Sequence, residues 1–408
     1  MFVVENSGWQ SYFLLLLILV FWGVWPALRR MSNDASSQAF SVVMVFSQYV
    51  TTCGICFFLG SITERGSSMF PEPSFAWAIV DDSGKTLSIL LLLVGGCCIA
   101  YGDSAATMAI EHLGLALGGP MVFGISLSFG TAFDFVLQRK NTTSEAVLLF
   151  MAVVCVFWAI YIDACSHEHN MDKAKTAPVS LPHQTLEKNK KMPYRKCKSM
   201  INMDAAKPQS SLLAIPQHAF VDVECSKKSM EIPLLPNVAI HAIPRPRAIK
   251  LALAGGMVMA CWSACSTAAT DVDSMYFYSL FFWFQTGEVI GIMPSVMMQL
   301  KIAGDPKNLR DVLREIRSMT LSDVACSATA GIFVAVGYFC YFATSDTIPR
   351  ATAFAFGSCS PIVNKAVAYV FREYDDFSWK GKFYLLFSAF LYAVAIYLLY
   401  LSTKDLAL

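Results

Sequence analysis

The chain has 408 residues, of which 55% are hydrophobic and only 15% are charged. Soluble globular proteins carry about 25% charged residues, so this composition excludes a soluble enzyme. The 31 lysines and arginines nearly balance the 30 aspartates and glutamates, which excludes the basic surface that a nucleic-acid-binding protein needs. The composition therefore predicts an all-α membrane protein embedded in the lipid bilayer.

Ten stretches are apolar enough to cross the hydrocarbon core as helices, which takes about 20 residues for each crossing. Arg29 and Arg30 follow the first stretch where a signal peptide would have its cleavage site, so we interpret that stretch as a transmembrane helix. In chain order the ten stretches cover residues 10–28, 38–61, 87–109, 115–137, 144–163, 248–268, 275–299, 322–344, 351–371 and 383–402.

The ten stretches form two halves of five, separated by a long polar segment. We predict a first transmembrane half over residues 1–165 and a second over residues 247–408. Residues 166–246 carry proline, serine and lysine without sustained apolar periodicity, which predicts a disordered linker. Such a linker would also be available to cytosolic binding partners.

The two halves resemble each other. Residues 102–138 align with residues 337–373 at a constant offset, which places Glu111 on Asp346. Because five is an odd number, the second half must enter the membrane from the opposite side. The sequence thus predicts two inverted five-helix repeats, an architecture common among secondary transporters that bind substrate near the membrane midplane.

The distribution of lysine and arginine predicts the orientation, because these residues are enriched in cytoplasmic loops. Most of them fall on the inner side when the N-terminus is placed outside. We therefore expect both termini outside, residues 166–246 in the cytosol, and the plasma membrane as the location.

Four ionisable residues are predicted inside the spans, where charge is costly and usually faces a cavity or a partner. Lys365 is predicted at nearly the depth of Asp103, with Glu288 near the middle of its span. We expect Lys365 to pair with Asp103 or Glu288. In one interpretation these three residues couple transport to protons, and in the other they form a static pair that fixes helix packing. Asp134 lies near the outer end of its span and is expected to be a solvated carboxylate.

Neutral polar and aromatic residues inside the spans are the candidate substrate-binding groups. The indole of Trp22 offers a planar face, while amide side chains offer hydrogen bonds without charge. Each of these residues alone also fits ordinary helix packing. The candidates are Trp22, Gln48, Gln285 and Asn364.

Missing motifs narrow the function further. None of the six histidines lies deep in a predicted span, which disfavours haem and histidine-ligated metal proteins. No Walker A motif is present, which excludes a self-contained ATP-driven pump. We expect no catalytic residue, no metal site and no cofactor.

Several stretches are similar to the plant ureide permeases, a branch of the drug/metabolite transporter superfamily. The similarity is most specific at Met1-Phe-Val-Val-Glu5 and at Phe21-Trp-Gly-Val-Trp-Pro-Ala27. It continues through 95–115 and 133–139, and thins to 330–338 and 371–374 in the second half. The resemblance implies a proton-coupled importer of neutral nitrogen heterocycles such as allantoin, uracil and xanthine. The chain departs from the family in lacking a Walker-A-like segment in its linker.

The leading hypothesis is a secondary transporter of small polar metabolites that works by proton symport. One alternative is a nucleotide-sugar or organic-phosphate exchanger of an internal membrane, although phosphate recognition calls for several converging cations. Another is a membrane receptor or assembly subunit that transports nothing.

Overall fold

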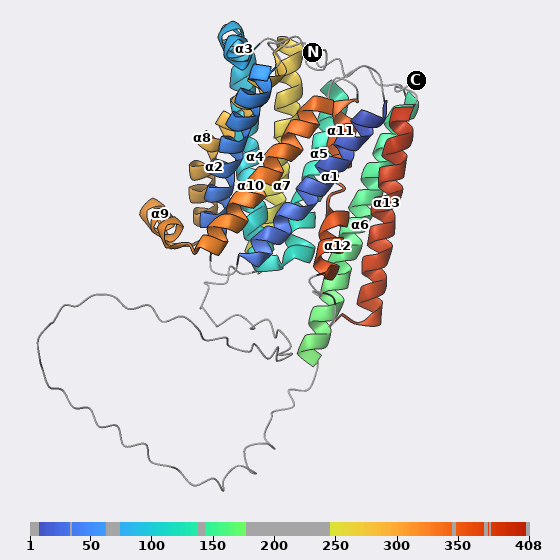
Figure 1. The fold of residues 1–408 in the computed structure, drawn as a ribbon. Helices are drawn as coiled ribbons and strands as arrows, with labels where there is room; N and C mark the ends of the chain where they lie inside the picture. The colour runs from blue at the N-terminus through green and yellow to red at the C-terminus, as the bar shows by residue number, and fades with distance from the viewer. Residues whose placement is uncertain are drawn as a thin grey trace, which may run out of the picture. The chain divides into compact units, whose positions relative to one another are not determined.

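The computed structural model describes residues 8–32, 35–62, 74–137, 143–176, 245–344, 348–370, 374 and 377–404. Within these ranges the chain is helical and contains no strand (Figure 1). The helices are α1 (Gly8–Met31), α2 (Ser37–Ile62), α3 (Phe75–Asp82), α4 (Thr86–Leu113), α5 (Leu115–Leu137), α6 (Thr143–Thr176), α7 (Arg245–Val272), α8 (Phe277–Ala303), α9 (Leu309–Ser318), α10 (Leu321–Thr344), α11 (Arg350–Gly357), α12 (Pro361–Val370) and α13 (Trp379–Lys404).

Nine helices of the described ranges are long and apolar enough to cross a membrane. They are α1, α2, α4, α5, α6, α7, α8, α10 and α13, and each coincides with a stretch predicted from the sequence. Helix α1 begins and α13 ends on the same side of the bundle (Figure 1). Most of the predicted linker, residues 177–244, lies outside the described residues.

The predicted span over residues 351–371 is wrong as a single continuous helix. It is divided into α11, of 8 residues, and α12, of 10 residues, with a tight turn at 358–360 between them. Pro361 has no backbone N–H to donate to the carbonyl of Gly357, and its ring disfavours helical geometry at the preceding residue. A helix that ends at this point is the expected consequence.

Two short helices, α3 and α9, were not predicted, because a search for membrane-length apolar stretches passes over them. Helix α9 has a strong local start signal. The Asn308 side chain accepts hydrogen bonds from the backbone N–H groups of Arg310 and Asp311, and Asp311 accepts one from the N–H of Asn308. This reciprocal capping box begins the helix despite its short length.

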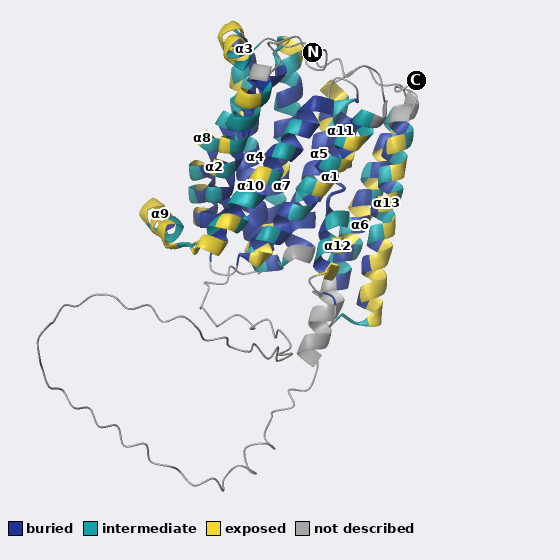
Figure 2. Cartoon of the chain, viewed as in Figure 1, coloured by how far each residue is buried: buried dark blue, intermediate teal, exposed yellow. Residues whose placement is uncertain are grey.

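Helices of opposite halves pack against each other. Helix α4 packs against α7 and α8, while α10 packs against α1 and α2. Glycines allow close approach at both contacts: a Cβ atom at Gly96 would lie 2.6 Å from the backbone N of Glu288, and one at Gly331 would lie 2.9 Å from the backbone N of Gln48. Small residues of this kind are typical of tightly packed membrane helices. Buried residues fill the interior, and exposed ones follow the outer faces of the bundle (Figure 2).

Candidate functional site

A small cavity lies beside the turn that separates α11 from α12. Its walls come from α1, α4, α5, α7, α10 and the turn itself. Aromatic rings, one carboxyl group and two serine hydroxyls meet there, so the cavity combines planar apolar faces with a few polar groups, as small-molecule sites do. The lining residues are Trp22, Trp25, Asp103, Phe123, Met259, Val334, Tyr338, Gly357, Ser358 and Ser360.

The turn can be buried because its backbone remains hydrogen-bonded. The N–H of Ser360 donates to the carbonyl of Gly357, and the N–H of Val363 donates to the carbonyl of Ser360, each over 3.0 Å. Gly23 of α1 permits close contact with the turn, since a Cβ atom there would lie 2.9 Å from the Ser360 carbonyl oxygen. The hydrogen bonds and the missing side chain together hold the interrupted helix against α1.

The indole ring of Trp22 packs against two glycines beside the cavity, Gly337 and Gly357. A Cβ atom at Gly337 would overlap the indole ring, and one at Gly357 would lie 2.6 Å from its Cζ3 atom. The ring centroid lies 5.2 Å from that of Tyr338 and 6.4 Å from that of Trp262. The indole Nε1 is buried and has no hydrogen-bond partner among the described residues. Trp22 therefore presents both a planar face and a free donor.

Alanine at Gly337 is expected to lower the thermal unfolding midpoint of the purified protein, because the new methyl group would overlap the Trp22 ring. Overpacking of this kind costs about 1–3 kcal/mol. The matched control is Gly54→Ala on α2, where an added Cβ meets nothing within 4 Å. There the better helix propensity of alanine should keep or raise the midpoint. Equal losses in the two variants would contradict a specific contact with Trp22.

Asp103 and Glu288 are buried carboxyl groups on α4 and α8, two helices that pack against each other. Asp103 lines the cavity, and its Oδ2 atom has no hydrogen-bond partner among the described residues. Glu288 is fully buried and accepts a 2.6 Å hydrogen bond from Gln48 Nε2. The charge of Asp103 acts on Glu288, which places the two carboxyl groups within electrostatic reach. Gln285, also buried, precedes Glu288 by one turn of α8.

The expected pairing of Lys365 with Asp103 or Glu288 is wrong. The ammonium group of Lys365 lies 2.7 Å from Asp163 Oδ2 on α6 and donates to Ser388 Oγ on α13 over 2.8 Å. It also lies 4.1 Å from the ring centroid of Tyr392. The position of Lys365 along its helix does not determine the direction of its side chain, which points to the peripheral helices α6 and α13.

Asp134 is not the solvated carboxylate that its position near a helix end predicts. It is fully buried, and it accepts hydrogen bonds from Ser263 and from Thr267, the latter over 3.1 Å. Both donors belong to α7, which packs against α5. Side chains of α7 therefore supply the hydrogen bonds that water was expected to supply.

Of the four predicted substrate-binding residues, Trp22 lines the cavity. Gln48, Gln285 and Asn364 are not among its lining residues. Asn364 lies on the first turn of α12, with both amide atoms buried and without hydrogen-bond partners among the described residues. The sequence reasoning missed Tyr338 and Ser358, whose residue types alone carry no signal of a site. It also missed Asp163, which stood at the predicted end of a span.

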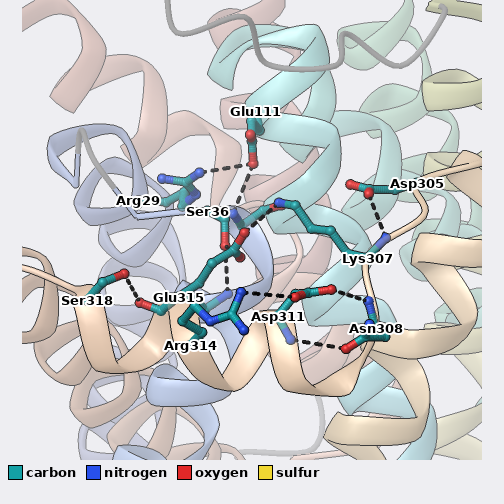
Figure 3. Close-up of polar contacts among 12 residues, drawn as sticks. Arg29, Ser36, Glu111, Asp305, Lys307, Asn308, Asp311, Arg314, Glu315 and Ser318 are labelled. Atoms are coloured by element: carbon teal, nitrogen blue, oxygen red, sulfur yellow. Dashed lines mark hydrogen bonds and ion pairs between the residues drawn. The ribbon is translucent and has the colours of Figure 1, made fainter.

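A layer of charged and polar groups closes one end of the bundle, on the side of α9 (Figure 3). Arg29 on α1 pairs with Glu111 on α4 over 3.1 Å. Glu315 on α9 accepts a 2.6 Å hydrogen bond from Ser36 and pairs with Lys307 over 2.7 Å. Burial alone would lower the pKa of Lys307, but the hydrogen bond and charge of Glu315 outweigh it and raise that pKa. Asp346, the predicted counterpart of Glu111, lies outside the described residues.

No group of three or more metal-binding side chains that could hold an ion occurs in the described ranges. The chemistry that this interior offers consists of proton uptake by carboxyl groups, hydrogen bonding and aromatic contact.

Comparisons with known proteins place these features in a family context. The family model described as ureide permease matches residues 41–402. Ureide permease 4 of Arabidopsis thaliana is 27% identical over 188 residues, which cover 46% of this chain and 45% of that protein. Ureide permease 5 of the same plant is 26% identical over 183 residues, covering 44% of this chain and 43% of that protein. The matched stretch thus spans less than half the length of these relatives. No solved structure matches the chain.

Proposed function

Because this chain belongs to the ureide permease family, we propose that it is a secondary active transporter of ureides and nucleobases, such as allantoin and uracil, that works by proton symport. The observation that carries this proposal is the cavity at the interrupted helix, where Trp22 and Asp103 lie together in an integral membrane protein. Relatives named ureide permeases support the substrate class.

The cavity suits a flat, neutral and polar substrate. The indole of Trp22 and the ring of Tyr338 offer faces for stacking, and Ser358 and Ser360 offer hydroxyl groups for the carbonyl and N–H groups of a heterocycle. Asn364, with its free amide, begins the helix that follows the turn.

The packing of the helices supports two inverted repeats. The offset that aligns residues 102–138 with 337–373 also places Gly96 on Gly331. Gly96 packs against α8 at Glu288, and Gly331 packs against α2 at Gln48. Gln48 and Glu288, the residues that face these two glycines, are hydrogen-bonded to each other. A bond between residues that face equivalent positions of the two halves is expected near a pseudo-two-fold axis in the membrane plane.

In this proposal Asp103 and Glu288 carry protons. Lys365 is not the partner of these carboxyl groups, because its ammonium group pairs with Asp163. It joins α12 to α6 and α13, so it takes part in transport through the position of α12. The protein resides in the plasma membrane with both termini outside and residues 166–246 in the cytosol, where this linker is open to cytosolic partners.

The alternative of a phosphate-bearing substrate has less support. No lysine or arginine is among the residues that line the cavity, and phosphate recognition relies on such cations. The second alternative is a receptor or assembly subunit that transports nothing. Measured uptake of substrate would exclude this alternative.

The test is uptake of labelled allantoin and labelled uracil by cells that express the protein, at mildly acidic and mildly alkaline pH. Saturable uptake that is faster in acid is expected. Trp22→Leu should raise the KM, because stacking of a base-like ring on an aromatic side chain is worth about 1–3 kcal/mol. The matched control is Trp158→Leu, since Trp158 lies exposed on α6. Absence of uptake with the protein at the cell surface would overturn the proposal.

A further inference from the structure

Helix α9, Leu309–Ser318, lies against the bundle on the side where α8 ends and α10 begins (Figure 1). Val312 is its buried residue and belongs to the hydrophobic core. Glu315 fastens the helix through Ser36 and Lys307, which belong to the charged layer shown in Figure 3. Helix α9 is therefore held in a defined rotation about its own axis.

This rotation turns a second, apolar edge away from the bundle. At 3.6 residues per turn, Leu309 and Leu313 share one edge of the helix, and Leu309 also neighbours Val312. They remain 45% and 44% exposed, respectively. Met298 and Ile302, near the end of α8, are exposed as well, at 55% and 42%. A surface of this kind on a membrane-spanning bundle faces lipid rather than water.

Basic residues border the leucines on the side away from the bundle. Arg310, Arg314 and Arg317 follow one another at helical spacing and are all exposed. The acidic residues lie on a third edge of the helix: Glu315 bonds to Ser36 and Lys307, while Asp311 bonds to Asn308 and also pairs with Arg314 over 3.5 Å. The Arg314 side chain is nevertheless 80% exposed, so the row of three arginines remains open to the surroundings of the bundle.

A short helix with exposed leucines beside a row of arginines is typical of helices that lie in the membrane interface. The guanidinium group binds phosphate through paired hydrogen bonds. We propose that α9 is a docking surface for anionic phospholipids of the adjacent leaflet, with Leu309 and Leu313 among the acyl chains and Arg310, Arg314 and Arg317 on the headgroup phosphates. This surface is separate from the cavity and does not depend on the substrate.

Hydrogen–deuterium exchange of the full-length protein tests the proposal in nanodiscs of phosphatidylcholine alone and in nanodiscs that also contain phosphatidylserine. Amides of α9 are expected to exchange about tenfold more slowly with phosphatidylserine, because an anionic membrane surface attracts the basic side chains that lie beside it. The difference should shrink at high salt. Defined nanodiscs hold no other protein, so slower exchange reports lipid rather than an acidic protein partner.

The variant R310Q/R314Q/R317Q is expected to lose the difference between the two lipid compositions. The matched control K250Q/K380Q/K382Q removes three exposed lysines at helix ends on the same side of the bundle, and should keep it. Equal exchange of wild-type α9 in both kinds of nanodisc would overturn the proposal, as would a protection that survives loss of the three arginines. The wild-type comparison remains decisive even if a variant fails to fold.

Discussion

Lys365→Met is expected to destabilise the protein strongly. Its ammonium group is the partner of Asp163, whose side chain is only 1% exposed. Removing the lysine leaves a carboxylate in the interior with its main counter-charge gone, and breaking a buried ion pair in this way costs about 3–5 kcal/mol. Thermal unfolding in detergent and the yield of monodisperse protein measure the effect.

The matched control is Lys307→Met. Lys307 pairs with Glu315 over the same 2.7 Å, but its side chain is 34% exposed. A partly solvated pair contributes about 0–1 kcal/mol, so this variant should unfold close to the wild-type midpoint. Burial, rather than the distance between the charges, accounts for the expected difference.

The double variant Asp163→Asn/Lys365→Met separates loss of packing from loss of charge balance. Neither new side chain is charged, so most of the lost stability should return. A double variant as unstable as Lys365→Met would contradict the ion-pair explanation and point to the contacts of Lys365 with Ser388 and Tyr392.

Asp163 also illustrates what the sequence could and could not predict. Apolar length located nine long helices, because a membrane crossing imposes that length on every span. The end of a helix is less constrained: α6 continues to Thr176, beyond the predicted end at Asp163. Because Asp163 stands at the boundary of its apolar stretch, the sequence offers Lys365 only Asp103 and Glu288 as partners at a similar depth.

The cavity was predictable in part. The sequence indicates Trp22 and Asp103 separately, as an aromatic ring and a charge inside apolar stretches, and the structure brings them to the same cavity. Hydropathy predicts one continuous span through the turn at 358–360, because it does not register a missing N–H. Pro361 was the available signal, since it cannot continue a helix from the preceding turn.

Glu288→Gln is expected to abolish proton-driven accumulation while leaving exchange of substrate across the membrane. Glutamine keeps the size and hydrogen-bonding groups of the side chain, including a partner for Gln48. It cannot take up a proton, so each transport cycle would lose the coupling ion. With one proton per substrate, a gradient of about one pH unit supports about tenfold accumulation in the wild type. The variant should only equilibrate.

The measurement uses proteoliposomes with an imposed pH gradient for accumulation, and preloaded proteoliposomes without a gradient for exchange. Asp271→Asn is the control, because Asp271 is exposed at the end of α7. It should accumulate substrate like the wild type. A Glu288→Gln protein that still accumulates substrate against its gradient would contradict a proton-carrying role for Glu288.

Asp103→Asn distinguishes the two carboxyl groups. Asp103 lines the cavity, whereas Glu288 is bonded to Gln48 on the neighbouring helix. Loss of Asp103 is therefore expected to raise the KM as well as to weaken coupling, while loss of Glu288 should change coupling with little effect on the KM. If both variants raise the KM equally, substrate and proton share one site. If only Asp103→Asn raises the KM, substrate and proton bind at separate groups.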